Sequence, residues 1–211
     1  NLTGTGDLPP RDVRRRILVP GQVEDDASIR LGAGTERRNL DLLARVRTEN
    51  PHAFVIYKPH PDVEAGLRPG KIARADLARL ADHVADHADP VALLKQVDEV
   101  WTITSTLGFE ALLRGLPVTT LGAPFYAGWG LTRDLGPVPA RRQARVGLDQ
   151  LTHAVLIAYP RYADPVTGLP CPPEVAMDRL ADPSLSARGP KLRLLAKLQG
   201  AMAGHSWLWR R

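Results

Sequence analysis

Residues 100–122 constrain the fold of this chain more than any other stretch, and they read VWTITSTLGFEALLRGLPVTTLG. The stretch opens with a run rich in β-branched residues, which favours a buried strand. A hydroxyl-bearing turn, Ser105-Thr106, comes next and is followed by a short apolar helix over 107–114. A second β-favouring run, 117–121, closes the unit. Strand, turn, helix and strand in this order predict a parallel βαβ unit.

The turn in this unit is a candidate ligand site. It lies at the carboxyl end of a strand and the amino end of a helix, where α/β folds bind ligands. Backbone N–H groups and the helix dipole favour an anion there, and Ser105 and Thr106 add hydroxyl donors. Gly108 follows closely, and Glu110 is placed to accept hydrogen bonds from a ribose diol. We therefore predict a nucleotide or nucleotide-sugar site, with a plain helix N-cap and a solvated glutamate as the alternatives.

The rest of the chain continues the alternation of strands and helices. Further strands are predicted at 17–19, 53–57 and 83–85, and further helices at 35–50, 71–80 and 89–97, the first of these capped by Thr35. This alternation predicts an α/β fold with a doubly wound parallel sheet and right-handed crossovers. Beyond it we expect a long Gly/aromatic loop at 123–136, an amphipathic helix at 148–159, a loop at 162–173 and a short helix at 174–180.

Three regions follow from this pattern. Residues 1–16 read as a linker that ends in a basic cluster, 17–160 as a Rossmann-like domain, and 161–211 as a helical extension with a basic tail. The chain starts without Met and its start is polar, so we expect a fragment of a longer protein. No apolar run approaches the ~20 residues that span a bilayer, and no signal peptide is recognisable.

The single cysteine and the histidines carry little chemistry in this pattern. Cys171 excludes a disulfide within the chain, which fits a reducing cytosol, and it lies in a proline-rich loop without a nearby base. A catalytic thiol is therefore not predicted. His52, His83, His87, His153 and His205 show no metal-ligand spacing, so we expect no bound metal.

The net charge of +5 is unevenly distributed. Residues 188–211 hold six Lys and Arg residues and no acid, which leaves the remainder of the chain at −1. The basic character thus belongs to a tail. Binding of nucleic acid is not predicted, because the chain shows no aromatic-basic platform and no known reading motif.

Three polar turns follow predicted strands, at 22–26, 58–61 and 105–106. The carboxyl ends of parallel strands meet at one edge of a sheet, so these turns are expected to converge on one rim. This convergence is the strongest functional indication that the residues alone provide.

Four phrases together resemble a known family. They are VPGQVEDDASIRLG (19–32), YKPHPD (57–62), TSTLGFEALLRGLPV (104–118) and GAPFYAGWGLT (122–132). In this order they are similar to the KpsC/LipB family of capsule polysaccharide glycosyltransferases, which are retaining β-Kdo transferases. The resemblance covers 17–162 and implies a two-domain GT-B enzyme with CMP-Kdo as donor. The chain looks like the carboxyl-terminal, nucleotide-binding half of one of two catalytic modules.

The resemblance implies a nucleophile in the first turn. Gln22 and Asp26 match a Q-x-x-x-D pattern whose aspartate is the proposed nucleophile, and Asp25 competes with Asp26 for that role. A carboxylate that attacks the anomeric carbon and is then displaced accounts for retention. Adjacent carboxylates repel each other, so the pKa of one of them is expected to rise. A solvated acidic turn is the alternative reading.

The resemblance also implies the donor-binding residues. His60 matches a His-Pro motif that hydrogen-bonds the CMP phosphate or assists its departure, and Lys58 would add positive charge beside it. Ser105 and Thr106, with Gly108 behind them, match the phosphate-binding Ser/Thr motif, and Glu110 would bind the ribose. A strand-end histidine fixed by two prolines is the alternative for His60, and these prolines are expected to forbid regular structure in the turn.

These observations give one leading hypothesis and two alternatives. The chain is expected to be the donor-nucleotide-binding domain of a retaining β-Kdo transferase with no tightly bound cofactor, inactive without its amino-terminal half. Its expected partners are CMP-Kdo, a glycolipid acceptor, that missing half and a second module. The alternatives are a GT-B transferase or epimerase that uses a UDP-sugar, and a non-catalytic scaffold of capsule export.

The basic tail, 188–211, has three readings. It is an amphipathic helix on anionic lipid, a brace for the amino-terminal half, or a solvated linker helix. The first reading adds peripheral contact with the inner membrane to a cytoplasmic location.

Overall fold

The computed structural model describes residues 8–182 of the 211-residue chain. The described residues form two compact units, 8–151 and 152–182, which are treated separately below. The sequence prediction placed this boundary at residue 160. The predicted basic helix within 188–211 lies outside the described residues.

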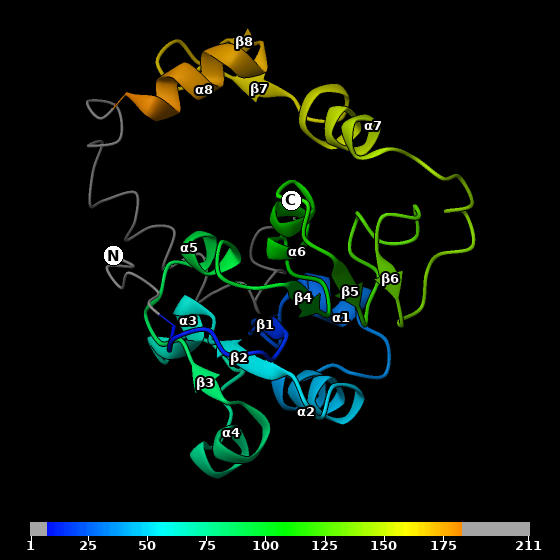
Figure 1. Cartoon of the computed structure of the whole chain (residues 1–211). Coiled ribbons are helices and arrows are strands. Elements are labelled where there is room, and N and C mark those ends of the chain that lie inside the picture. Colours follow the sequence, from blue (N-terminus) through cyan, green and yellow to red (C-terminus); the bar gives the residue numbers. More distant parts are fainter. Residues whose placement is uncertain (1–7, 183–211) are drawn as a thin grey trace. The chain divides into compact units, whose positions relative to one another are not determined.

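The first unit contains a parallel sheet (Figure 1). Its strands are β1 (Arg16–Pro20), β2 (Phe54–Lys58), β3 (His83–Val84), β4 (Glu99–Thr102), β5 (Val118–Thr120) and β6 (Arg133–Asp134). They lie in the order β3-β2-β1-β4-β5-β6, and each neighbouring pair is parallel. The chain moves outward from β1 to β3 and then returns to β4 on the other side of β1. The topological switch point, where such folds bind ligands, therefore lies between β1 and β4.

Helices cover both faces of this sheet, which confirms the predicted doubly wound fold. They are α1 (Ala27–Gly32), α2 (Asn39–Glu49), α3 (Pro61–Glu64), α4 (Arg74–Leu80), α5 (Pro90–Leu94) and α6 (Leu107–Leu112). Figure 1 shows α2 and α4 on one side of the sheet and α5 and α6 on the other. Ile17, Val19 and Trp101 join the core cluster that contains the apolar side of α2. The alternate strand residue Leu18 is equally buried, as the two-residue repeat of a strand covered on both faces requires.

Three local predictions for this unit are wrong. Thr35 does not cap a helix, because α2 begins at Asn39, whose side chain is used to fix the preceding loops. The His-Pro turn is not wholly irregular, because Pro61 occupies the first position of α3, where its missing N–H has no role. The loop 123–136 contains the edge strand β6.

The boundary between the two units falls within α7 (Leu148–His153). This helix continues as the π-helix η1 (Ala154–Ala158), and together they match the predicted helix at 148–159. Strands β7 (Tyr162–Ala163) and β8 (Pro170–Cys171) form an antiparallel pair, so the prediction of a plain loop there is wrong. Asp164 tightens the hairpin by accepting hydrogen bonds from Val166 N and Thr167 Oγ1. The helix α8 (Pro173–Ala181) confirms the predicted short helix at 174–180.

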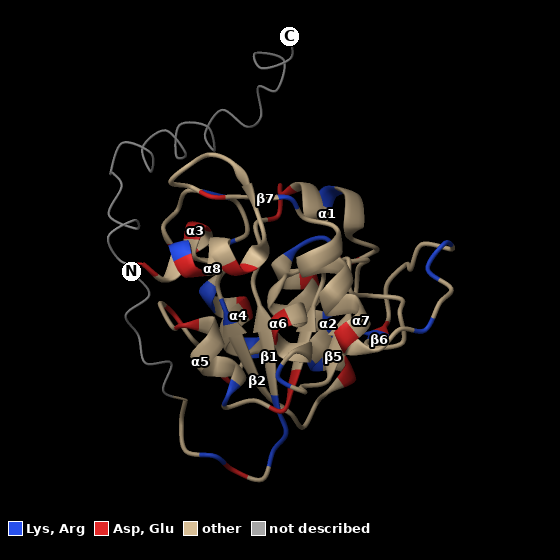
Figure 2. Cartoon of the chain, turned by 90° about the horizontal axis from the view of Figure 1, so that it is seen from above, with Lys and Arg blue, Asp and Glu red and all other residues tan. Residues whose placement is uncertain are grey.

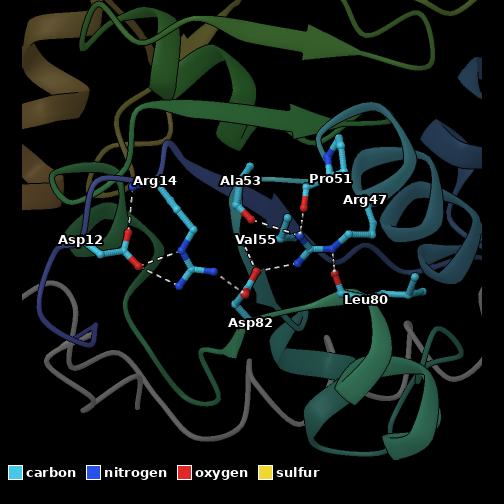
Figure 3. Close-up of polar contacts among 8 residues, drawn as sticks. All are labelled: Asp12, Arg14, Arg47, Pro51, Ala53, Val55, Leu80 and Asp82. Carbon is cyan, nitrogen blue, oxygen red and sulfur yellow. Dashed lines mark hydrogen bonds and ion pairs between the residues drawn. The ribbon is translucent and has the colours of Figure 1, made fainter.

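An ion-pair network ties the amino-terminal edge of the sheet, away from the candidate rim (Figure 3). Asp82 accepts hydrogen bonds from Val55 N and from the guanidinium groups of Arg14 and Arg47. Arg47 also donates to the carbonyl oxygens that end α4 and begin β2. Burial opposes ionisation of Asp82, but the Val55 amide and the Arg47 guanidinium hold its pKa below the usual value. Arg14, from the basic cluster that was predicted to end a linker, therefore takes part in an ion pair that joins two segments of the fold.

Among residues 8–182, no helix has the length and apolar character needed to cross a bilayer.

Candidate functional site

The turn after β1 and the turn after β2 are in contact at the rim of the sheet. Gly21 N donates to Lys58 O at 2.7 Å. A Cβ on Gly21 would stand 2.6 Å from Tyr57 Oη and 3.2 Å from His60 N. Only glycine leaves room for this approach, so the sequence at 20–22 brings the acidic turn beside the His-Pro turn.

Gln22 joins the turn after β1 to the turn after β4 across the switch point. Its Oε1 accepts hydrogen bonds from Ile103 N at 3.2 Å, Thr104 N at 3.0 Å and Thr102 Oγ1 at 3.2 Å. Its Nε2 donates to Thr104 Oγ1 at 2.9 Å, and the residue is only 6% exposed. The structure thus places this predicted catalytic residue beneath the rim, as a brace that holds two of the three polar turns together.

Asn39 is a site-building residue that the sequence reasoning missed. The side chain is buried at the start of α2, where its Oδ1 accepts from Gln22 N and its Nδ2 donates to Gln22 O and Gly70 O, each at 2.8 Å. Its backbone amide donates to Glu24 Oε1 at 2.8 Å. An asparagine can pair with a loop backbone as another strand would, and this one fixes the loop that follows β1. No local pattern marked it, because its partners are far away in the sequence.

The acidic turn divides its carboxylates between different partners. Asp26 is the N-cap of α1, where its Oδ2 accepts from Ser28 N at 2.9 Å and Ser28 Oγ at 2.7 Å. These hydrogen bonds, led by that of the Ser28 hydroxyl, lower the pKa of Asp26. The rise expected for one of the two adjacent carboxyls is therefore not found at Asp26. Asp25 instead forms an ion pair with Arg68, at 2.7 Å between Oδ1 and Nη2.

His60 lies at the rim as the N-cap of α3. Its Nδ1 accepts a hydrogen bond from Asp62 N at 3.1 Å, and its side chain is 38% exposed. In the neutral ring the proton must then be on Nε2, which leaves Nε2 as a hydrogen-bond donor. The turn therefore fixes the tautomer that would donate to a phosphate oxygen.

Lys58, in contrast, lies below the rim. Its Nζ is 3.2 Å from Glu64 Oε2 and donates to Pro59 O at 2.7 Å. Its side chain is 4% exposed and that of Glu64 is 7% exposed. The ammonium group is thus buried and held by two protein groups, a carbonyl and a carboxylate.

The turn after β4 presents hydroxyl groups next to the residues that Gln22 holds. Ser105 N donates to Thr102 Oγ1 at 3.0 Å, and Ser105 Oγ accepts from Leu107 N at 3.2 Å. Thr106 is exposed at the N-cap position of α6, and its side chain makes no capping bond. The Glu110 carboxylate, 41% exposed, is 3.9 Å from Arg114 Nη1.

Gly108 serves the packing of the aromatic loop that follows β5. A Cβ at Gly108 would stand 2.1 Å from Tyr126 Oη, and the Tyr126 hydroxyl donates to Ser105 O. The Tyr126 ring is fully buried between Phe109 and Phe125. Tyr126 therefore supports the Ser-Thr turn from below, a role the sequence reasoning did not assign to it.

A groove of about 590 Å³ adjoins the rim on the side of β3. Its wall includes Pro59 and Glu64 from the His-Pro turn and α3, and Asp86 and His87 from the loop after β3. Residues of α4 form another wall. The groove therefore runs along β3, from Pro59 and His87 near the rim to Asp82 at the amino-terminal end of the strand.

Acidic and basic residues are interspersed along the described elements (Figure 2). Within residues 8–182, no group of three or more His, Cys, Asp or Glu side chains has an arrangement that could hold a metal ion.

Comparison with known proteins gives consistent results. Residues 9–162 match the family model described as capsule polysaccharide biosynthesis protein. The capsule polysaccharide modification protein LipA of Neisseria meningitidis serogroup A is 58% identical over 167 residues, which are 79% of this chain and 24% of LipA. The lipopolysaccharide-processing protein LpsZ of Rhizobium meliloti is 52% identical over 155 residues, 74% of this chain and 35% of LpsZ. The chain thus spans about a quarter to a third of these relatives.

Two solved structures of KpsC from Thermosulfurimonas dismutans have a similar fold. The β-Kdo 2,7 transferase is 40% identical with a TM-score of 0.73, and the β-Kdo 2,4 transferase is 36% identical with a TM-score of 0.71. Each match covers 82% of this chain, and 56% and 55% of the respective KpsC chains.

Proposed function

This chain belongs to the capsule polysaccharide biosynthesis protein family, and from that premise we propose that it is the donor-binding domain of a β-Kdo transferase that uses CMP-Kdo. The observation that carries the proposal is the joining of three polar turns at the switch point by Gly21 and Gln22. The likeness to two KpsC transferases supports Kdo as the sugar. The acceptor is a glycolipid, and the amino-terminal half of the enzyme completes the site.

In this proposal the phosphate of CMP binds between His60 and the Ser105-Thr106 turn. The Nε2–H of His60 donates to a phosphate oxygen, and the hydroxyl of Thr106 and the amino end of α6 add further donors. As the bond to the sugar breaks, charge grows on this phosphate, so donors already in place lower the barrier. Ser105, with its support from Tyr126, keeps the turn in position.

Asp26 is the proposed nucleophile, with Asp25 as the competing candidate. The N-cap contacts with Ser28 hold Asp26 through one oxygen and favour its ionised form. Asp25 is partly neutralised by Arg68. Attack of the Asp26 carboxylate on the anomeric carbon expels CMP, and the acceptor hydroxyl then displaces the carboxylate. Two inversions give net retention.

Thermal unfolding with nucleotides tests the donor assignment. CMP at ~100 times its dissociation constant should stabilise the chain by about 2.7 kcal/mol, which raises the unfolding midpoint by several degrees. We expect this shift with CMP and not with UMP, and expect His60→Ala to abolish it. His52→Ala is the matched control, because His52 is exposed at the start of β2, at the opposite edge of the sheet. A shift with UMP alone would instead favour a UDP-sugar enzyme.

Kdo transfer by a longer protein that contains both halves tests the chemistry. Asp26→Asn should abolish transfer, whereas Asp25→Asn should retain it. Mass spectrometry should detect a Kdo adduct on the peptide that carries Asp26. Unchanged transfer in Asp26→Asn would remove Asp26 as the nucleophile. Absence of both Kdo transfer and a nucleotide shift in the wild type would favour a non-catalytic scaffold.

A further inference from the structure

The buried ion pair between Lys58 and Glu64 is placed to control the geometry of the rim. Lys58 ends β2 and Glu64 ends α3, so the pair closes the short segment that contains His60. Both side chains are almost completely buried, and removing either partner would leave a buried charge without its counterion.

Each member of the pair also holds a backbone group of a rim loop. Lys58 Nζ donates to Pro59 O at 2.7 Å, the carbonyl immediately before His60. Glu64 Oε1 accepts from His87 N at 2.8 Å, in the loop that follows β3. One ammonium–carboxylate unit therefore joins the His-Pro turn to the next loop of the rim, and both loops line the groove beside His60.

The loop after β3 depends on this contact. His87 has a φ of 55°, in the left-handed region that a residue with a side chain seldom adopts. Such a conformation persists only where surrounding contacts fix it. The hydrogen bond from His87 N to Glu64 is a contact of this kind, whereas the His87 side chain is 75% exposed and its Nδ1 lies 4.0 Å from Glu64 Oε2.

We propose that Glu64, acting through Lys58 and the His87 amide, is a positioning residue that sets His60 and the loop after β3 for donor binding. This inference rests on the proposed function and reassigns Lys58 from a phosphate contact to a partner in positioning. A carboxylate suits the position because both of its oxygens accept, one from Lys58 and one from His87. A glutamine would turn its NH₂ group toward one of these two donors.

Four variants separate positioning from simple stability. Glu64→Gln and Lys58→Met each break the pair, and the double variant Lys58→Met/Glu64→Leu replaces it with apolar groups. Glu99→Gln is the matched control. Glu99 is also a buried carboxylate, which accepts from Trp101 Nε1 at 2.7 Å and pairs with Arg15, but it lies at the amino-terminal edge of the same sheet. Each variant is measured by thermal unfolding without ligand and by calorimetric titration with CMP.

We expect Glu64→Gln to weaken CMP binding roughly 10-fold or more, because a small misplacement of a binding group has a large effect. Apolar replacement of both partners of a buried pair often restores stability. The double variant should therefore unfold near the wild-type temperature and still bind CMP weakly. Glu99→Gln should lose stability and keep the wild-type affinity.

The inference is overturned if Glu64→Gln binds CMP as wild type, if the double variant regains affinity along with stability, or if Glu99→Gln weakens binding equally. A measurement without ligand tests this inference independently of the proposed function. Nitrogen-15 NMR of the His60 imidazole should show a proton fixed on Nε2 in the wild type and averaged tautomers in Glu64→Gln. If wild type fails to bind CMP, the proposed function is lost, and identical His60 spectra in the two proteins would overturn the inference as well.

Discussion

Replacement of Gln22 by methionine is the sharpest test of the brace at the switch point. Methionine has nearly the same length and volume, so the change removes hydrogen bonds without leaving a large cavity. The amides of Ile103 and Thr104 then lose their shared acceptor in a buried place. The Thr102 hydroxyl loses the same acceptor but can rotate, whereas the two amides are fixed in the backbone.

The magnitude follows from these two amides. A buried donor left without a partner costs about 1–3 kcal/mol, so the free energy of unfolding should fall by about 2–6 kcal/mol. At the lower end of this range, the midpoint of thermal unfolding for a chain of this size falls by roughly 4–8 °C. Urea denaturation followed by circular dichroism measures the free energy directly.

Gln143→Met is the control for this substitution. Gln143 is exposed, and a surface change of this kind should stay within about 0.5 kcal/mol of wild type. If Gln22→Met is equally neutral, the Gln22 side chain does not hold the turn after β4. Gln22 would then again be a candidate for the catalytic role at the rim that the sequence suggested.

Three further outcomes are expected. Gly108→Ala should strongly destabilise the fold, because the added Cβ would collide with Tyr126 Oη. Adding Tyr126→Phe should recover part of the lost free energy of unfolding, as measured by urea denaturation. No recovery would contradict the contact between these two residues. Asp82→Asn should lower stability near neutral pH. Its difference from wild type should begin to shrink as the pH falls below ~3.9, the pKa of an unfolded carboxyl, and should be lost as the pH passes through the lower pKa of folded Asp82. A pH-independent difference would argue against this. Asp26→Asn should unfold like wild type, because asparagine also caps helices, whereas Asp26→Ala should lower the free energy of unfolding by about 1 kcal/mol. Equal losses in the two variants would show that Asp26 does not stabilise α1 as its N-cap.

The sequence predicted the parts of the fold that depend on local patterns. The β-branched run after residue 99 and the Gly-Pro punctuation after the next helix both indicate a βαβ unit, and a parallel sheet follows from their repetition. Turn chemistry likewise marked the His-Pro and Ser-Thr segments. Predictions failed where contacts distant in the sequence override local preference. Thr35 is a good capping residue, but Asn39 begins the helix because its side chain is needed to bind the loop beside Gln22.

The sequence by itself determined the α/β class, the order of strands β1 to β5 and the family, because these depend on patterns contained within short stretches. Only the tertiary structure decided what the polar residues of these stretches do. Gln22 and Lys58 carry polar side chains that the sequence assigned to catalysis and donor binding. In the structure both are buried and hydrogen-bonded to other protein groups. Asp26 and His60 stand at helix starts, where the same local bonds that fix the backbone also set the ionisation of one and the tautomer of the other. A side chain's role depends on what surrounds it in space, and the linear sequence does not specify those neighbours.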